Sequence, residues 1–316
     1  MCEHKVLPGV CIAATKSGAG KTMFTCGLIR ALSDRGSTVQ SFKAGPDYID
    51  PLFHDQVLGD QGYTSGKDII NRNGKKDPEG KAEPDRKKYP DGFEYSLHKC
   101  ENLDSFFLEK NQLRDLYERC SNDADISVVE GVMGLYDGIF PPDINNLQIH
   151  SHSENNEEIS RKSEDRPEND LVDIMVEGDP GGLRLDAIRG SVYEIASILD
   201  IPIILVVDAK GAAMSLIAGI RGFKYYDTSD LIKGVVFNRC SKGVFEKLKE
   251  PVIKELGIRA LGFIPVLEDI KIESRYLGLS LPGEIVDIKH KIGLIAKTID
   301  KNVDIGGILE ISCCKG

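Results

Sequence analysis

A glycine-rich stretch near the start of the chain ends in a lysine and a threonine, a combination that can hold phosphate. In IAATKSGAGKTMF, residues 12–24, an apolar run leads into Gly20, Lys21 and Thr22, and a segment with helical spacing follows. In such a context the backbone N–H groups of the turn and the positive end of the helix meet the phosphates. The lysine would reach the β- and γ-phosphates, and the threonine hydroxyl would ligate Mg²⁺. We therefore predict a site for ATP and Mg²⁺. The predicted nucleotide-binding residues of this loop are Ser17, Gly18, Ala19, Gly20, Lys21 and Thr22.

The loop departs from the commonest phosphate loop, and the departure leaves two classes of protein open. Thr15 stands where the first glycine of GxxxxGKT would, so the pattern is better written AxxxxxGKT from Ala14. Lengthened loops of this kind are similar to those of dethiobiotin synthetase and its relatives. Lys16, however, occupies the position of the extra lysine that Min/Par-type partition ATPases use across a dimer. The loop alone fits either a small-molecule synthetase or a dimerising ATPase switch.

A second stretch gathers charged residues after the next apolar run. FKAGPDYIDPLFH, residues 42–54, puts Lys43, Asp47, Asp50 and His54 in one turn-rich loop at the C-terminal end of a strand. Open α/β sheets bind their ligands at that edge. Two aspartates beside a lysine can hold Mg²⁺ and orient an anion. Each aspartate also adjoins a proline, so an ordinary turn role stays open for either residue.

A third stretch delivers a carboxylate at the end of another apolar run. In ISVVEGVMGLYDG, residues 126–138, Glu130 closes the run in the way that a Walker B carboxylate does. A carboxylate there suits Mg²⁺ coordination beside Thr22. Asp137 follows past a glycine-rich bend, and spacing alone gives it no role.

The elements that must position these residues alternate between apolar strands and helices. Strands are predicted at 9–15, 38–45, 124–131, 201–211, 231–240 and 258–266. Helices are predicted at 21–36, 212–226, 245–257 and 285–300. Continuous apolar runs joined by helices indicate a mainly parallel sheet covered on both faces. The predicted class is a doubly wound α/β fold.

Two stretches interrupt this pattern. Residues 60–99 are dense in Lys, Asp, Gly and Pro, and residues 141–170 are similar but lean towards acidic residues. Neither stretch has enough apolar surface to offset the entropy of ordering it. We expect both to be mobile insertions.

Net charge, apolar runs and cysteine content limit which partners and which cellular location fit the sequence. The net charge is -10, with no basic stripe, which disfavours binding to nucleic acid or to an anionic membrane. No apolar run is long enough to span a bilayer, and the N-terminus lacks a signal-peptide core. The eight cysteines form no CxxC pair and are expected to be free thiols. We expect a cytoplasmic protein.

Taken in order, the motifs resemble those of cobyrinic acid a,c-diamide synthases. SGAGKT, FKAGPDYIDPLFH, NLDSFFL, VVEGVMGLYDG, GSVYEIASILDIPIILVVDAKG, GVVFNR and RYLGLSLPGE follow the family's order and cover nearly everything outside the two interruptions. Partition ATPases lack both PDYIDP and EGVMGLYDG. The resemblance implies the family's N-terminal synthetase domain, with a fold like P-loop NTPases and dethiobiotin synthetase. It also implies ATP-dependent amidation of acetate carboxylates on a corrin-type macrocycle, through an acyl phosphate.

The resemblance also implies roles for single residues. Those that match the nucleotide and Mg²⁺ end of the family site are Lys21, Thr22, Asp47 and Glu130, of which Thr22, Asp47 and Glu130 would be the metal ligands. Those that match positions nearer the acyl phosphate and the ammonia are Lys43, Asp50 and Asp137. Asn238 and Arg239 match the segment that recognises adenine. Tyr276 departs from the Arg-His that the family tends to show there, which puts its role in doubt.

Full-length members of that family carry a C-terminal glutaminase domain, and this chain ends about where that domain would start. We therefore expect a single synthetase domain over 1–312 and a short tail at 313–316. Ammonia would come from a separate glutaminase subunit or from free ammonium. A truncated copy that binds nucleotide without amidation also remains open, as does a homodimer of the Min/Par kind.

Overall fold

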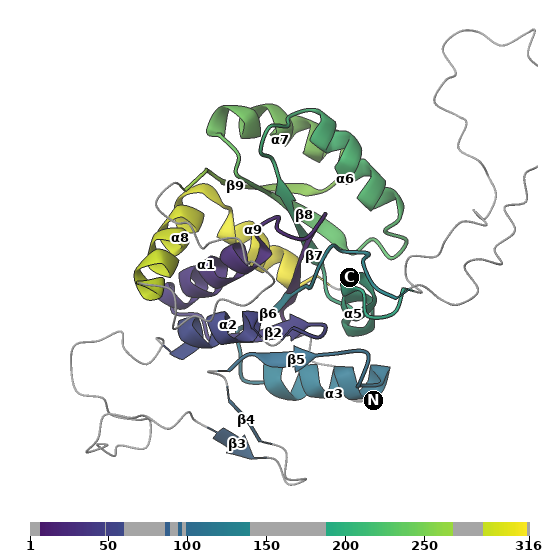
Figure 1. Ribbon diagram of the computed structural model, residues 1–316, viewed down its shortest axis with the longest axis vertical. Helices are drawn as coiled ribbons and strands as arrows, with labels where there is room; N and C mark the ends of the chain where they lie inside the picture. The colour runs from purple at the N-terminus through teal and green to yellow at the C-terminus, as the bar shows by residue number, and fades with distance from the viewer. Residues whose placement is uncertain are drawn as a thin grey trace, which may run out of the picture.

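A parallel sheet of seven strands forms the centre of the part of the chain that the structure describes (Figure 1). The computed structural model describes residues 7–47, 49–59, 86–88, 94–96, 99–139, 188–267 and 287–314. The strands of the sheet, in chain order, are β1 (Gly9–Ala14), β2 (Val39–Ala44), β5 (Glu101–Leu103), β6 (Ile126–Glu130), β7 (Ile203–Asp208), β8 (Ile232–Asn238) and β9 (Arg259–Ile264). Their order across the sheet is β5-β2-β6-β1-β7-β8-β9, and every pairing is parallel.

Helices cover both faces of this sheet. The helices that pack on one face are α1 (Lys21–Asp34), α2 (Asp50–Gly59), α8 (Ile288–Asn302) and α9 (Ile305–Ser312). Those on the other face are α3 (Lys110–Ser121), α5 (Val192–Leu199), α6 (Ser215–Tyr225) and α7 (Lys242–Leu256). The predicted doubly wound α/β fold is therefore confirmed.

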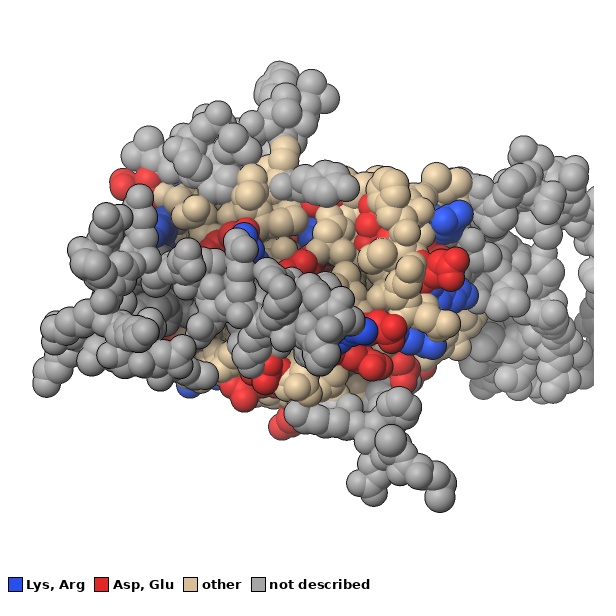
Figure 2. Space-filling model, turned by 90° about the horizontal axis from the view of Figure 1, so that it is seen from below, with Lys and Arg blue, Asp and Glu red and all other residues tan. Residues whose placement is uncertain are grey.

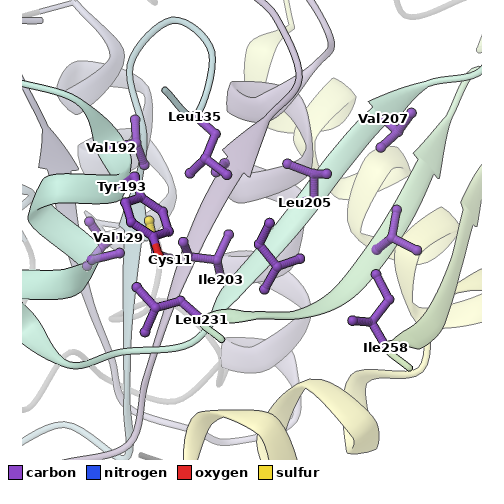
Figure 3. Close-up of a cluster of buried hydrophobic side chains, with 14 of the residues drawn as sticks. Cys11, Val129, Leu135, Val192, Tyr193, Ile203, Leu205, Val207, Leu231 and Ile258 are labelled. Carbon is purple, nitrogen blue, oxygen red and sulfur yellow. The ribbon is translucent and has the colours of Figure 1, made fainter. Parts of the chain in front are cut away.

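Strand residues supply alternate side chains to the two layers. Along β1, Val10 and Ile12 pack into the layer of α1 and α8, whereas Cys11 and Ala13 pack into the layer of α3 and α5. This alternation follows from the two-residue period of a strand, and a strand covered on both faces is apolar throughout. Figure 3 shows part of the second layer, in which Tyr193 of α5 belongs to the same buried cluster as Cys11 and Val129 of the sheet.

The close packing of α1 on α8 brings together helices from opposite ends of the chain (Figure 1). Gly27 of α1 permits this approach, because a Cβ atom at that position would lie 2.4 Å from Ile295 Cγ2 of α8. The helix that follows the phosphate loop is thus held against the last long helix.

The six strands and four helices predicted from the apolar pattern are all present, with shifts of a few residues at their ends. One prediction is wrong: the segment around PDYIDP is not a single turn-rich loop. Lys43 lies inside β2, and Asp50 and His54 lie in α2, so only Asp47 stays in the connection. The carboxylate Oδ1 of Asp47 accepts hydrogen bonds from the N–H groups of Ile49 and Asp50 and starts the helix.

Most of the two interruptions lies outside the described residues. Within 60–99 the structure describes an antiparallel pair, β3 (Arg86–Lys88) with β4 (Glu94–Ser96), and Lys99. Residues 141–170, which the sequence predicts to be mobile, are outside the described ranges, as is Tyr276.

Three bulk expectations can be compared with the described residues. Every cysteine among them is a free thiol, as predicted, and Cys11 and Cys26 are buried. None of the helices among the described residues is both long enough and apolar enough to cross a membrane. On the uncovered part of the face in Figure 2, acidic and basic side chains lie next to one another rather than in a basic stripe.

Candidate functional site

The glycine-rich loop connects β1 to α1, as the sequence predicts, and β1 lies in the middle of the sheet. Gly20 precedes α1 with φ of 98°, and a Cβ atom there would lie 2.2 Å from Asn238 Nδ2. A residue with a side chain would meet both the left-handed backbone and this neighbour, so the position needs glycine. No side chain caps the first turn of α1, which leaves its N–H groups directed at the loop.

Lys21 is held beneath the loop that follows β6. Its ammonium donates to the carbonyl oxygen of Met133, a residue whose own φ is 48°. Burial lowers the pKa of Lys21 to about 8; Glu130 opposes this shift and the ammonium of Lys43 adds to it. A phosphate at the loop would supply the negative charge that this lysine lacks.

Glu130 is the point at which the predicted stretches meet. It is the last residue of β6 and is fully buried, and its Oε1 accepts a hydrogen bond of 2.7 Å from Thr22 Oγ1. Burial alone would raise the pKa of Glu130, but Lys43, together with hydrogen bonds from His54 and Thr22, holds it well below its usual range. The carboxylate is therefore ionised, and it lies beside the threonine that the sequence pairs with it.

Lys43 links the PDYIDP segment to Glu130. The two residues are partners in the β2–β6 ladder, and the ammonium of Lys43 donates to Glu130 Oε1 at 3.2 Å. It also donates to Asp50 Oδ2 at 2.7 Å and to the carbonyl of Gly131 at 3.1 Å. Asp47 Oδ2 lies 3.6 Å from the same nitrogen. Three carboxylates thus lie around one ammonium that is 1% exposed.

Asp137 helps to shape the loop after β6. Its Oδ2 accepts a hydrogen bond of 2.8 Å from the N–H of Gly134. Its charge also acts on Lys21, although burial and the two nearer charges affect that lysine more. The structure therefore brings Asp137 to the same edge of the sheet as the other predicted carboxylates.

Asn238 and Arg239 lie at the end of β8 and reach the phosphate loop from its other side. Asn238 Nδ2 donates to the carbonyl of Ala19 at 2.8 Å, so the strand end is tied to the loop. The guanidinium of Arg239 forms a two-pronged pair with Asp208, with Nε to Oδ1 at 2.8 Å. Lys16 joins the same aspartate, with its Nζ 3.4 Å from Oδ2, and is 64% exposed.

The sequence pattern assigned no role to three residues that stand behind Glu130: Ser41 and His54, which are buried, and Cys100, which is partly buried. His54 Nε2 lies 2.6 Å from Glu130 Oε2, and His54 Nδ1 lies 2.6 Å from Ser41 Oγ. The thiol of Cys100 is 3.3 Å from the same ring nitrogen. Helical spacing was the missing signal, because residues four apart share a helix face and Asp50 already pointed to the site.

The site offers few metal ligands of its own. Among the described residues, no group of three or more His, Cys, Asp or Glu side chains is placed to hold a metal ion. The hydroxyl of Thr22 and the carboxylate of Glu130 are nevertheless the hard oxygen ligands that Mg²⁺ prefers. Because Mg²⁺ is commonly bound by one or two protein oxygens together with substrate phosphates, these residues fit the ion.

Comparison with known proteins gives the family. Residues 10–277 match the model described as "CobQ/CobB/MinD/ParA nucleotide binding domain". The chain belongs to this family. The match spans the phosphate loop, the PDYIDP segment, Glu130 at the end of β6 and the end of β8. The family resemblance predicted from the motifs is therefore confirmed.

Curated relatives are identical to this chain at about a third of the aligned positions. Cobyrinate a,c-diamide synthase of Methanocaldococcus jannaschii is 34% identical over 97% of this chain and 51% of its own. Cobyrinate a,c-diamide synthase of Archaeoglobus fulgidus is 30% identical over 97% and 49%. Hydrogenobyrinate a,c-diamide synthase of Rhodobacter capsulatus is 28% identical over 96% and 51%. The chain spans about half the length of the curated relatives it matches.

Among solved structures, the septum site-determining protein MinD complexed with Mg-ADP from Pyrococcus horikoshii OT3 is similar to this domain. The TM-score is 0.42 at 14% identity, over 96% of this chain and 93% of that one. At this TM-score and identity, the likeness carries no inference about function.

Proposed function

We propose that this chain is the synthetase part of an amidotransferase, a ligase that uses ATP to convert acetate carboxylates of a corrin-type macrocycle into amides. One observation carries the proposal: the phosphate loop and the Lys43-centred carboxylates converge on Glu130 at one edge of the sheet. That edge is where open α/β sheets bind ligands. The names of the curated relatives support the choice of substrate.

The proposed chemistry explains why ATP is needed. A carboxylate is a poor acyl donor, because the oxide that would have to leave is a strong base. In the proposed reaction a substrate carboxylate oxygen attacks the γ-phosphorus of ATP, the bond to the β–γ bridging oxygen breaks, and ADP leaves. Ammonia then attacks the acyl carbon, phosphate departs, and a proton is lost. The protein contributes mainly in-line positioning and charge neutralisation.

The site residues predicted from the sequence each have a part in this proposal. The loop residues Ser17 to Thr22 would hold the phosphates, with Lys21 at the β- and γ-groups. Thr22 and Glu130, with Asp47 nearby, would hold Mg²⁺, and the bound ion would neutralise phosphate charge. Asp50 and Asp137 would lie nearest the acyl phosphate and the incoming ammonia, with Lys43 fixing Asp50 in place.

The remaining expectations are part of the same proposal. Asn238 and Arg239 would line the adenine pocket. Residues 1–312 would form one synthetase domain that works in the cytoplasm, and ammonia would come from a separate glutaminase subunit or from free ammonium.

The test is direct conversion of substrate. Purified chain would be incubated with Mg-ATP, ammonium and cobyrinic acid, with hydrogenobyrinic acid and nickel-sirohydrochlorin in parallel. Product mass and phosphate release would be followed. We expect amide formation with ammonium, and its loss in Asp47→Asn. If no macrocycle is amidated although the chain binds ATP, the proposal is wrong.

A second candidate rests on Lys16, which is exposed beside the phosphate loop. A dimerising ATPase switch would use that ammonium across the dimer, after releasing it from Asp208 of the same chain. ATP-dependent dimerisation that disappears in Lys16→Ala, without any amidation, would favour the switch. Dimerisation that is unaffected by Lys16→Ala would argue against it. A chain that binds ATP but does neither would match a non-catalytic copy.

A further inference from the structure

His54 lies behind the nucleotide site with no exposed surface and with both ring nitrogens in short contacts. Nε2 is 2.6 Å from Glu130 Oε2, and Nδ1 is 2.6 Å from Ser41 Oγ. An ionised carboxylate can only accept, so Nε2 carries the hydrogen of this contact. Nδ1 is then able to accept from the hydroxyl of Ser41.

The contact with His54 completes the fixation of the Glu130 carboxylate. Oε1 accepts from Thr22 at 2.7 Å and from Lys43 at 3.2 Å, on the side of the phosphate loop. Oε2 is held by His54 on the opposite side. With both oxygens held, the carboxylate cannot rotate about its last bond, so Oε1 stays directed at Thr22.

Two neighbouring elements supply this support by their ordinary periodicity. In β2, Ser41 and Lys43 are two residues apart and share one face of the strand. In α2, Asp50 and His54 are four residues apart and share one face of the helix. In β2, Lys43 therefore reaches Asp50 and Glu130 Oε1, and Ser41 reaches His54. In α2, Asp50 reaches Lys43, and His54 reaches Glu130 Oε2.

We propose that His54 is a positioning residue that orients Glu130 for Mg²⁺ held with the nucleotide. The inference rests on the proposed use of Mg-ATP but not on the macrocycle. Residues that orient a metal ligand from behind change metal affinity about 10- to 100-fold when they are replaced. A residue that only filled space in the core would not discriminate between metal-bound and metal-free nucleotide.

The experiment measures ADP affinity of the whole chain by calorimetry, once with Mg²⁺ and once with a chelator. Two replacements of similar polarity form a matched pair. The amide nitrogen of His54→Gln reaches the place of Nε2 and can still donate to Glu130. The amide of His54→Asn reaches only the place of Nδ1 and leaves Glu130 Oε2 without its donor.

We expect His54→Asn to reduce the Mg²⁺-dependent gain in ADP affinity by roughly 10-fold or more. His54→Gln should retain most of that gain, and metal-free affinity should be the same in both. In a Glu130→Gln background, His54→Asn should have no further effect, because the two residues act through one contact. Circular dichroism and the thermal midpoint would show that each variant is folded.

Four results would count against the inference. Equal losses in the Asn and Gln variants, or effects that add to Glu130→Gln, would make His54 a packing residue and overturn the inference alone. If wild-type chain gains no ADP affinity from Mg²⁺, the proposed use of Mg-ATP fails and the inference fails with it. Should His54→Asn not fold, Ser41→Ala, which removes the partner of Nδ1, should show a smaller loss in the same direction. No loss there would overturn the inference.

Discussion

Replacing Lys43 by methionine removes a buried cation that lies against three carboxylates, of which Asp50 and Glu130 are buried and Asp47 is partly exposed. Methionine keeps much of the side-chain volume, so the change is mainly electrostatic. Asp50 loses a contact of 2.7 Å and Glu130 one of 3.2 Å, and Glu130 has no exposed surface through which water could compensate. Breaking a buried pair by removing one partner costs about 3–5 kcal/mol. At about 2 °C per kcal/mol for a chain of this size, the midpoint of thermal unfolding should fall by roughly 6–10 °C.

The loss of unfolding free energy in Lys43→Met should depend on pH in a defined direction. In the wild type, burial would raise the pKa of Glu130, but Lys43, with His54 and Thr22, holds it below its usual range. That carboxylate therefore stabilises the fold at pH values above the ordinary glutamate pKa, and the contribution is lost on acidification. Without Lys43 the effect of burial gains weight and the pKa of Glu130 rises. The folded variant then takes up a proton at a higher pH than the wild type does. Its loss of unfolding free energy relative to the wild type should therefore be smaller at pH 5.5 than at pH 7.5.

Urea unfolding at several pH values measures both effects, with Lys254→Met as the control. Lys254 is largely exposed, so its ion pair with Glu250 should contribute less than about 1 kcal/mol at any pH. A loss below about 1 kcal/mol for Lys43→Met at pH 7.5, or a loss of the same size at every pH, would show that Lys43 does not hold these carboxylates together.

Three further changes test the loop and its helix. Gly20→Ala should abolish nucleotide binding in calorimetry and cost about 1–3 kcal/mol of stability, because φ is 98° and a Cβ atom would lie 2.2 Å from Asn238 Nδ2; binding like that of wild type would contradict this. ATP affinity should be constant below pH 8 and fall by up to about tenfold per pH unit above it. The reason is that burial lowers the pKa of Lys21 to about 8 and bound phosphate favours the charged form of this lysine. An ATP affinity independent of pH up to 9.5 would refute the assignment of Lys21 to phosphate binding. Gly27→Ala should lower the thermal midpoint at a cost of about 1–3 kcal/mol, since its Cβ would lie 2.4 Å from a side chain of α8. Gly219→Ala, which meets nothing within 4 Å, should instead stabilise α6 by about 0.5–1 kcal/mol, and equal effects in the two variants would argue against the α1–α8 contact.

The sheet could be predicted from sequence because its strands are apolar on both faces. β1, β7 and β8 are nearly uninterrupted runs of small and branched residues, and the turns between them are marked by glycine. β5 could not be predicted, because three residues, Glu101–Leu103, are too few to show a period. α2 was hidden by Pro51, which indicates a turn as readily as the first turn of a helix.

The site could be predicted in part for a related reason. Glu130 ends β6 and Thr22 comes shortly after the end of β1. Parallel strands end at one edge of a sheet, so the proximity of these two residues could be predicted from the fold class alone. The burial of Lys43 could not be predicted, because hydropathy places a lysine at the surface. Only the pairing of β2 with β6 sets Lys43 against Glu130. The role of His54 depends on the turn of α2, which the sequence pattern did not reveal.

The order of strands in the sheet also has a kinetic consequence. Thr22 and Glu130 are separated by 108 positions in the chain, Lys43 and Glu130 by 87, and Ala19 and Asn238 by 219. Each of these contacts closes a long loop, and loop closure must precede the stabilisation that the contact gives. A partly folded chain therefore has no phosphate site to offer. ATP should bind the native state alone, so it should slow unfolding of the finished protein and leave the rate of its folding unchanged.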